Sequence, residues 1–214
     1  MNKNSSKQVL LSVLGVAILV VAVVGVSFAA FTWSSSDVTE NKISTGTLTM
    51  TYTTNSNGIN ITNAMPTSDA AGMALKDMAD GANNQTFKFT VAATISGTAT
   101  INYDLGLAKK APSANPLVDT DVHMYLATLS GETETAVKTA SGADTNGVFT
   151  FVAGGTATTN GVPATDMKIA TGSFSATGSQ QYILRMWLKE SYAFKSGDPV
   201  KDYAVTVKAY AKAA

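Results

Sequence analysis

Apolar and polar residues alternate along most of this chain after residue 47. In the segment 47–54, the apolar residues Leu48, Met50 and Tyr52 alternate with threonines, and this pattern predicts a β-strand with one buried face. Further alternation and short apolar runs predict strands at 59–62, 87–95, 98–107, 121–129, 133–138, 148–152, 167–174, 180–189 and 202–212. The segment 65–84 predicts a loop with at most one or two helical turns.

Two tight turns are expected between neighbouring strands. Gly97 is expected to start a hairpin between 87–95 and 98–107, and Ser-Gly-Glu at 130–132 predicts a second turn. Roughly eight to ten short antiparallel strands with almost no helix are typical of an all-β sandwich or jelly roll. No repeat or linker divides the chain further, so we assign residues 47–214 to one jelly-roll-like β-sandwich.

The N-terminus follows a different pattern, because it contains a long apolar run. Residues 1–8 are polar and include Lys3 and Lys7, whereas 9–30 is apolar except for two serines. A basic start, an apolar run and small residues at its end predict a signal peptide over 1–29. The alternative is a retained transmembrane anchor, because about 20 apolar residues span a bilayer. In both cases the remainder is exported, and the chain contacts the membrane only through 9–30 if that segment stays uncleaved.

The composition excludes several classes of function. Charged residues make up only 14% of the chain and 45% is hydrophobic, so we expect a folded domain and not a disordered one. Without Lys3 and Lys7, the exported part has 13 basic and 15 acidic residues, and it lacks the basic stripe that nucleic-acid binding requires. The chain contains no cysteine, which excludes disulfides, thiolate metal sites and a cysteine nucleophile.

His123 is the only histidine, and it lies in a predicted strand. The opposite face of that strand carries apolar residues, so His123 is expected to face solvent or a sheet rim, and one histidine does not make a zinc site. Two pairs of carboxylates could supply oxygen ligands to calcium, namely Asp119 with Asp121 and Asp198 with Asp202. Neither pair lies in a glycine-punctuated ligand loop, so we expect solvated loop carboxylates and no metal site.

Arg185 and Trp187 share one face of a late predicted strand. They could form an exposed aromatic patch for a partner, but a pair on the outer face of a sheet is the more common arrangement. The chain has no serine nucleophile elbow, phosphate-binding loop or metalloprotease motif. The sequence therefore offers no catalytic residue and no cofactor site, and we expect a protein that is not an enzyme.

The N-terminal boundary resembles that of a family of exported bacterial proteins. The segment 27–33 reads Ser-Phe-Ala-Ala-Phe-Thr-Trp, and 41–50 reads Asn-Lys-Ile-Ser-Thr-Gly-Thr-Leu-Thr-Met. Both are similar to the start of TasA/camelysin-family proteins, which are processed by a dedicated signal peptidase of the SipW type. Weaker similarities are Asn-Ala-Met-Pro at 63–66 and the predicted strand at 87–93.

The resemblance implies a cleavage site, a fold and a function. Cleavage would fall between Ala29 and Ala30, which leaves an extended N-terminal arm over residues 30–46. The family implies a jelly-roll β-sandwich and, for TasA-type members, biofilm matrix fibres in which the N-terminal segment of one subunit completes the sheet of the next. The implied partners are further copies arranged head to tail, the SipW-type peptidase, and an anchor or accessory matrix protein. Camelysin is described as a metalloprotease, but this chain has one histidine and no His-Glu-x-x-His, so that activity is not carried over.

The N-terminal arm has features that suit strand donation. Phe31 and Trp33 are two residues apart, so they lie on the same side of an extended strand. Their rings are expected to anchor the arm while its backbone pairs with the edge of a neighbouring sheet. The alternatives are that the segment 30–37 pairs within its own sheet or stays frayed. We therefore expect an extracellular or cell-surface fibre subunit, with a monomeric, membrane-anchored binding or adhesion module as the alternative.

Overall fold

The computed structural model describes residues 33–34, 41–45, 48–54, 58–59, 64–76, 84–96, 99–110, 115–140, 142–197 and 199–214. Regular structure in these ranges is almost entirely β-strand, which confirms the predicted all-β class. The predicted signal segment 1–29 and the cleavage residues Ala29 and Ala30 lie outside these ranges. Within the described part of the chain, no helix combines the length and the apolar character that crossing a membrane requires.

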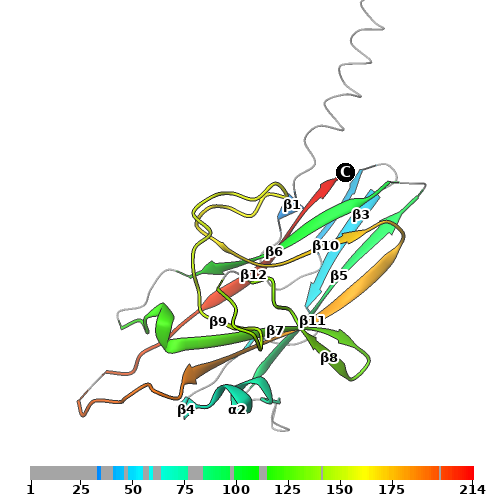
Figure 1. The fold of residues 1–214 in the computed structure, drawn as a ribbon. Helices are drawn as coiled ribbons and strands as arrows, with labels where there is room; N and C mark the ends of the chain where they lie inside the picture. Colours follow the sequence, from blue (N-terminus) through cyan, green and yellow to red (C-terminus); the bar gives the residue numbers. More distant parts are fainter. Residues whose placement is uncertain are drawn as a thin grey trace, which may run out of the picture.

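Two sheets make up the fold (Figure 1), and the smaller one is entirely antiparallel. Its strand order is β1-β12-β6-β10. The bounds are Trp33–Ser34 for β1, Val205–Ala213 for β12, Ile101–Lys109 for β6 and Met167–Phe174 for β10. The register between β12 and β6 is continuous, whereas the register between β10 and β6 shifts between Lys168 and Ala170.

The larger sheet has six strands in the order β2-β3-β5-β11-β7-β8, with two short strands beside them. The six are β2 (Asn41–Thr45), β3 (Leu48–Thr54), β5 (Thr86–Ile95), β11 (Gly178–Lys189), β7 (Val122–Ser130) and β8 (Thr133–Ala136). The short strand β4 (Pro66–Thr67) pairs in parallel with the end of β11, and β9 (Val148–Phe149) pairs with β7. The described helices are α2 (Asp69–Met73) and the 3₁₀ turn η1 (Asp119–Asp121).

Strands β5 and β6 lie in different sheets, so the predicted hairpin at Gly97 is wrong. β5 pairs with β3 and β11, whereas β6 pairs with β10 and β12. Alternation shows which face of a strand is buried, but it does not show which strand is the partner. The predicted turn at 130–132 does connect paired strands, β7 and β8, with Gly131 in the left-handed region at φ 61°.

Paired strands begin inside the predicted N-terminal arm. Both β1 and β2 fall within residues 30–46, and each pairs at a sheet edge. β1 pairs with β12 of the smaller sheet, and β2 pairs with β3 of the larger sheet. Part of the arm segment therefore contributes to each sheet.

The main core lies between the two sheets. The apolar faces that alternation predicted are buried there, with Tyr52 of β3, Phe89 of β5 and Leu105 of β6 each 1% exposed or less. Burial of these faces is the main driving force for packing the sheets together. The hydroxyl groups of Tyr103 in β6 and Tyr182 in β11 lie 2.8 Å apart within this core, and this hydrogen bond joins the two sheets.

Candidate functional site

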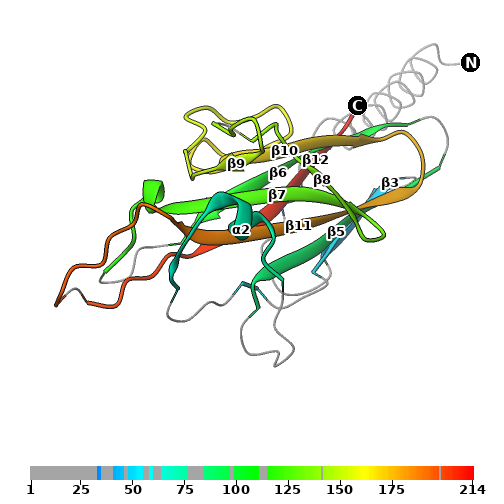
Figure 2. The same cartoon turned by 60° about the horizontal axis from the view of Figure 1, so that its bottom comes forward.

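A strap, defined here as residues 64–76, crosses the outer face of the larger sheet. It contains β4 and α2, and Figure 2 shows α2 lying over β7 and β11. The strap covers a second apolar cluster on this face, and Met73 and Leu75 of the strap pack against it. The buried members of the cluster are Tyr125, Ala127, Val148, Ile183 and Trp187. Parts of β7 and β11 are therefore buried on both faces, which the sequence did not predict.

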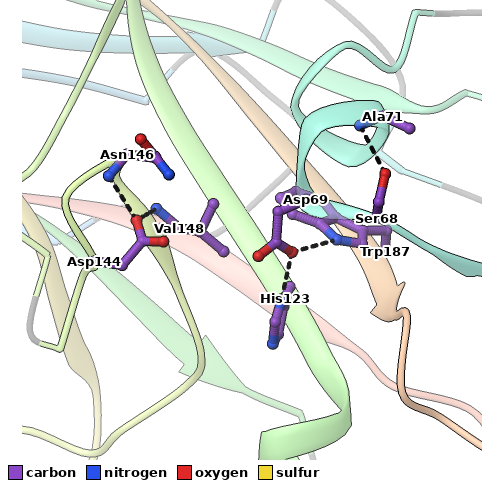
Figure 3. A network of polar contacts seen from close by, with 8 residues as sticks. All are labelled: Ser68, Asp69, Ala71, His123, Asp144, Asn146, Val148 and Trp187. Carbon is purple, nitrogen blue, oxygen red and sulfur yellow. Dashed lines mark hydrogen bonds and ion pairs between the residues drawn. The ribbon is translucent and has the colours of Figure 1, made fainter.

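Asp69 is at the centre of the polar contacts that fix the strap (Figure 3). Its Oδ1 accepts a hydrogen bond from Nε1 of Trp187 at 3.2 Å and lies 2.7 Å from Nδ1 of His123. The register pairs Trp187 with His123, and their rings meet edge to face with 6.1 Å between centroids. Ser68 caps α2, because its hydroxyl accepts the N–H of Ala71 at 3.4 Å. One carboxylate thus joins the start of α2 to both central strands.

Gly72 allows α2 to lie directly on the indole ring of Trp187. A Cβ at this position would lie 2.2 Å from Cδ2 and from Cε2 of the ring. Any larger residue must therefore lift the helix from the sheet or displace the indole. Close packing, and not backbone conformation, is the reason for glycine at this position.

Arg185 fixes the other end of the strap, although its side chain is buried. Its Nε donates to the carbonyl of Leu75 at 2.7 Å, and its terminal nitrogens donate to both carboxylate oxygens of Glu134 at 2.7 Å each. These hydrogen bonds from Arg185 lower the pKa of Glu134, so this carboxylate stays charged well into the acidic range. The buried guanidinium is therefore paired with a charged, bidentate partner, as burial of a charge requires.

The contacts of the strap test two predictions that were based on the sequence. His123 faces away from the main core as predicted, but it is hydrogen-bonded to the strap and only partly exposed. The alternative of an exposed patch at Arg185 and Trp187 is wrong, because these side chains are 3% and 4% exposed beneath the strap. Their position as a pair on the outer face of the sheet is confirmed.

An aspartate beside a histidine nitrogen is also the arrangement that orients a catalytic base. Here Asp69 additionally accepts the Trp187 N–H, and each of its contacts joins the strap to β7 or β11. The Asp69–His123–Trp187 cluster therefore acts as a clamp that holds the strap to the sheet.

The carboxylates Asp119 and Asp121 both have basic partners. Oδ1 of Asp119 accepts hydrogen bonds from Nζ of Lys109 at 2.7 Å and from the hydroxyl of Tyr203 at 2.8 Å. Asp121 forms an ion pair with Lys189 at 2.8 Å. These contacts tie η1 to β6, to β11 and to the segment before β12.

The structure describes only one member of the second carboxylate pair. Asp202 takes part in an isolated backbone bridge before β12, and Asp198 lies outside the described residues. Among the residues that the structure describes, no group of three or more histidine or acidic side chains could hold a metal ion.

The edge of the smaller sheet is a second candidate site, because the N-terminal arm pairs there. β1 runs antiparallel to β12, with Trp33 opposite Ala211 and Ser34 opposite Tyr210. β6 covers the other side of β12 over the whole length of that strand, whereas β1 covers two residues. In the described ranges, no other strand pairs with this side of β12. At Trp33 the arm thus pairs within its own chain, and Phe31 lies outside the described residues.

Buried polar contacts hold this end of β12 in place. The hydroxyl of Tyr210 donates to Oδ2 of Asp166 at 3.1 Å, and Nζ of Lys208 lies 3.5 Å from the same oxygen. Burial and the negative charge of Asp166 raise the pKa of Tyr210, so its hydroxyl stays protonated and continues to donate. Gly106 of β6 gives the Tyr210 ring room, since a Cβ there would lie 2.8 Å from Cε2. The edge next to the arm is therefore a fixed template.

The sequence alone did not point to Asp69, Gly72, Glu134 or Asp166. One signal could have located the first two, because Ser68 followed by an acidic residue and two alanines is a typical helix start. Glu134 and Asp166 act through contacts with residues more than 40 positions away, which no local pattern shows.

Comparisons of the chain with protein-family models, with curated proteins and with solved structures found no match.

Proposed function

We propose that this chain is an exported, non-enzymatic structural subunit that assembles head to tail into fibres at the cell surface or in an extracellular matrix. The N-terminal arm of one copy pairs with β12 of the next, as in the TasA-type fibres that the N-terminal boundary resembles. The pairing of β1 with β12 is the observation that carries this proposal. An edge that accepts the arm of its own chain presents the same backbone groups to the arm of another copy.

We also propose that the two sheets form a jelly roll. In support, eight strands divide between the sheets as two Greek keys would place them, with β1, β6, β10 and β12 in one and β5, β7, β8 and β11 in the other. The hairpin of β2 and β3 extends the larger sheet beyond β5. In this topology the first strand lies at an edge beside the last one. A strand from another copy could therefore replace β1 without rearranging β12, β6 or β10.

Strand β12 is a better acceptor than β10, the other edge strand of the same sheet. The register of β10 shifts between Lys168 and Ala170, whereas β12 pairs with β6 without interruption. A bulge is a feature by which proteins block pairing at an exposed edge. The uninterrupted β12 is the more regular template for an incoming strand.

Donation of the arm to β12 produces an open polymer. The arm and the acceptor edge are different surfaces, so the contact is heterologous and propagates unless the rotation between copies closes a ring. Backbone hydrogen bonds provide the pairing, and Phe31 and Trp33 are the proposed anchors. A SipW-type peptidase would free the arm at Ala30, and an anchor or accessory matrix protein would start the fibre.

Electron microscopy of negatively stained protein tests the proposed function. Protein beginning at Ala30 should form filaments, whereas protein beginning at Val38 lacks β1, the part of the arm that pairs with β12, and should stay monomeric. Filaments from both proteins would support fibre assembly but would show that residues 30–37 are not needed for it. Monodisperse particles from both would contradict fibre assembly.

The anchors can be tested separately from the rest of the arm. A variant with Phe31→Ala and Trp33→Ala should be secreted normally but should not polymerise. Its backbone can still pair with β12, but the rings that anchor the arm are missing. A variant with Ser34→Ala and Ser36→Ala in the same arm is the matched control and should form filaments. Unchanged filaments from the first variant would contradict the anchoring role.

A further inference from the structure

Large apolar side chains on the surface gather at one end of the molecule. Among the described residues five such side chains are exposed, and four of them surround the end of β11, namely Met65, Val118, Phe194 and Val200. Their exposed fractions are 69%, 58%, 57% and 93%, respectively. The fifth, Val152, lies in the connection between β9 and β10. We call the group of four the distal patch.

The loop after β11 carries two members of the distal patch, Phe194 and Val200. Within this loop the ring of Tyr192 contacts that of Phe194 edge to face, with 5.2 Å between centroids. Nζ of Lys201, the residue after Val200, lies 6.0 Å from the centroid of the Tyr192 ring. The two sides of the loop are therefore linked through Tyr192, and both present an apolar side chain to solvent.

The other two members lie on the segments beside this loop. The N–H of Leu117 donates to the carbonyl of Asp202 at 2.8 Å, which places Val118 beside the returning side of the loop. Met65 precedes β4, and β4 pairs with Leu188 and Lys189 at the end of β11. The distal patch thus spans three separate parts of the chain that meet at one end of the sheets.

The distal patch and β1 lie at opposite ends of the molecule. β12 begins at Val205, directly after the loop, and β1 pairs with β12 near its other end, at Ala211. Six residues of strand separate these two positions, or about 20 Å at the usual rise per residue. Figure 1 and Figure 2 both show the loop after β11 and the C-terminus at opposite ends.

The charges around the distal patch favour a protein partner over a lipid surface. The segment 189–202 contains three lysines and three acidic residues, so it carries no net charge. Lys189 is paired with Asp121, and Lys201 lies over the ring of Tyr192. Attraction to anionic lipids needs an excess of basic residues. An apolar protein surface can cover the patch without leaving these charges unpaired.

We infer that the distal patch docks against the opposite end of a second copy of this chain, the end that carries β1 and the C-terminus. This inference rests on the proposed head-to-tail assembly and adds a second contact to it. In an open polymer, one end of each subunit meets the other end of the next. The paired arm joins two copies through a short strand, and the distal patch provides the apolar contact that fixes their relative orientation.

A pair of matched variants tests this contact in protein beginning at Ala30. Replacing Phe194→Ser and Val200→Ser together should raise the protein concentration needed for filament assembly about tenfold or more, because exposed anchors at a contact are lost. Val152→Ser is the control, since it removes an exposed valine beside β10 and should leave assembly unchanged. Equal thermal unfolding midpoints of all three proteins would show that the fold is intact.

A second measurement reports directly on burial of the distal patch. The chain has no cysteine, so Val200→Cys introduces a single site for an environment-sensitive dye. Its emission should shift to the blue on assembly, whereas a dye at Val152→Cys should not respond.

The outcomes separate this inference from the proposed function. Filaments that form equally well from wild type and from the double variant, with no dye response, would overturn the distal contact and leave strand donation in place. Binding of the monomer to phosphatidylglycerol vesicles that the double variant abolishes would overturn it in favour of a lipid surface. The absence of filaments from wild type would overturn the proposed function and this contact together.

Discussion

At the scale of single residues, Gly72 and Trp187 show how one missing side chain positions a whole element. The indole covers the outer face of β11, and α2 can approach it only because position 72 has no Cβ. The same close contact brings Asp69 within reach of both Trp187 and His123. The clamp on the strap therefore depends on the missing side chain of a glycine, whose own hydrogen bonds are those of the helix backbone.

We predict that Gly72→Ala destabilises the protein. Alanine in a helix is favoured over glycine by up to about 1 kcal/mol. Displacing the indole by a Cβ that would lie 2.2 Å from two ring atoms is an overpacking change that costs about 1–3 kcal/mol. The cost of the clash should exceed the gain in helix propensity. Urea unfolding followed by circular dichroism should therefore show a lower free energy of unfolding for Gly72→Ala. Gly58→Ala is the control, because no atom lies within 4 Å of its Cβ position. A more stable Gly72→Ala protein would contradict the packing described here.

The hydroxyl pair Tyr103 and Tyr182 predicts a loss of stability at alkaline pH. Burial raises the pKa of Tyr103, and burial together with the neighbouring Tyr103 raises the pKa of Tyr182. In the unfolded chain both hydroxyls ionise near pH 10, while in the folded protein they keep their protons. The free energy of unfolding should therefore fall above pH 10, by up to about 1.4 kcal/mol per pH unit for each tyrosine.

The matched variant for this prediction replaces both partners, with Tyr103→Phe and Tyr182→Phe. Removing both hydroxyls leaves neither of them without its hydrogen-bond partner, so the stability of this variant at pH 7 should change little. Above pH 10 its free energy of unfolding should fall less steeply than that of wild type. Equal slopes in the two proteins would show that this pair does not contribute to the alkaline transition.

At the scale of elements, the strap is held at one end by Asp69 and at the other by Arg185. We predict that Glu134→Gln loosens the second end, because the buried guanidinium loses its charged, bidentate partner. Leaving donors of a buried group poorly satisfied costs about 1–3 kcal/mol. Glu132→Gln, in the turn just before β8, is the control and should be neutral. Hydrogen exchange should show faster opening of residues 69–75 in the Glu134 variant alone.

The ion pair of Arg185 and Glu134 makes the difference in stability between wild type and Glu134→Gln depend on pH. Because Arg185 lowers the pKa of Glu134, the pair stabilises the fold fully above the ordinary glutamate value of 4.5 and is lost as the pH falls through the lowered value. The stability gap between wild type and Glu134→Gln should therefore narrow only in acid below pH 4.5. A gap that stays constant down to pH 2 would contradict the ion pair as its cause.

How far the sequence predicts this fold depends on what a local pattern can report. Alternation located β10 at 167–174 with its observed bounds, and it identified the buried faces of β3, β5 and β6. It did not predict that β5 and β6 belong to different sheets, because a strand pattern does not specify its partner. It also missed the burial of Arg185 and Trp187, since the strap that covers them lies more than 100 residues earlier in the chain.

At the scale of the whole molecule, the proposed strand donation would make two uses of the N-terminal arm compete for one edge. Six residues separate β1 from β2, so the arm is tethered close to its own β12. A short tether corresponds to an effective concentration of about millimolar, which an arm from another copy must match. Assembly should therefore depend steeply on protein concentration, and release of the arm should limit its rate. A distal contact between copies would favour the exchange by holding the second copy in place.

This competition predicts that a covalent lock on the arm prevents assembly. Ser34 and Tyr210 are opposite each other in the β1–β12 register, and opposed residues in antiparallel strands lie about 4.5–5.5 Å apart at Cα, within the range of a disulfide. Protein with Ser34→Cys and Tyr210→Cys, oxidised in dilute solution, should remain monomeric because its arm cannot leave β12. Reduction should restore filament growth, measured by light scattering. The two single variants are controls for the loss of each side chain, and reductant should not change the assembly of either one. Filaments that grow equally from the oxidised and the reduced double variant would show that the arm at β12 is not exchanged between copies, and strand donation would have to be abandoned even if fibres form.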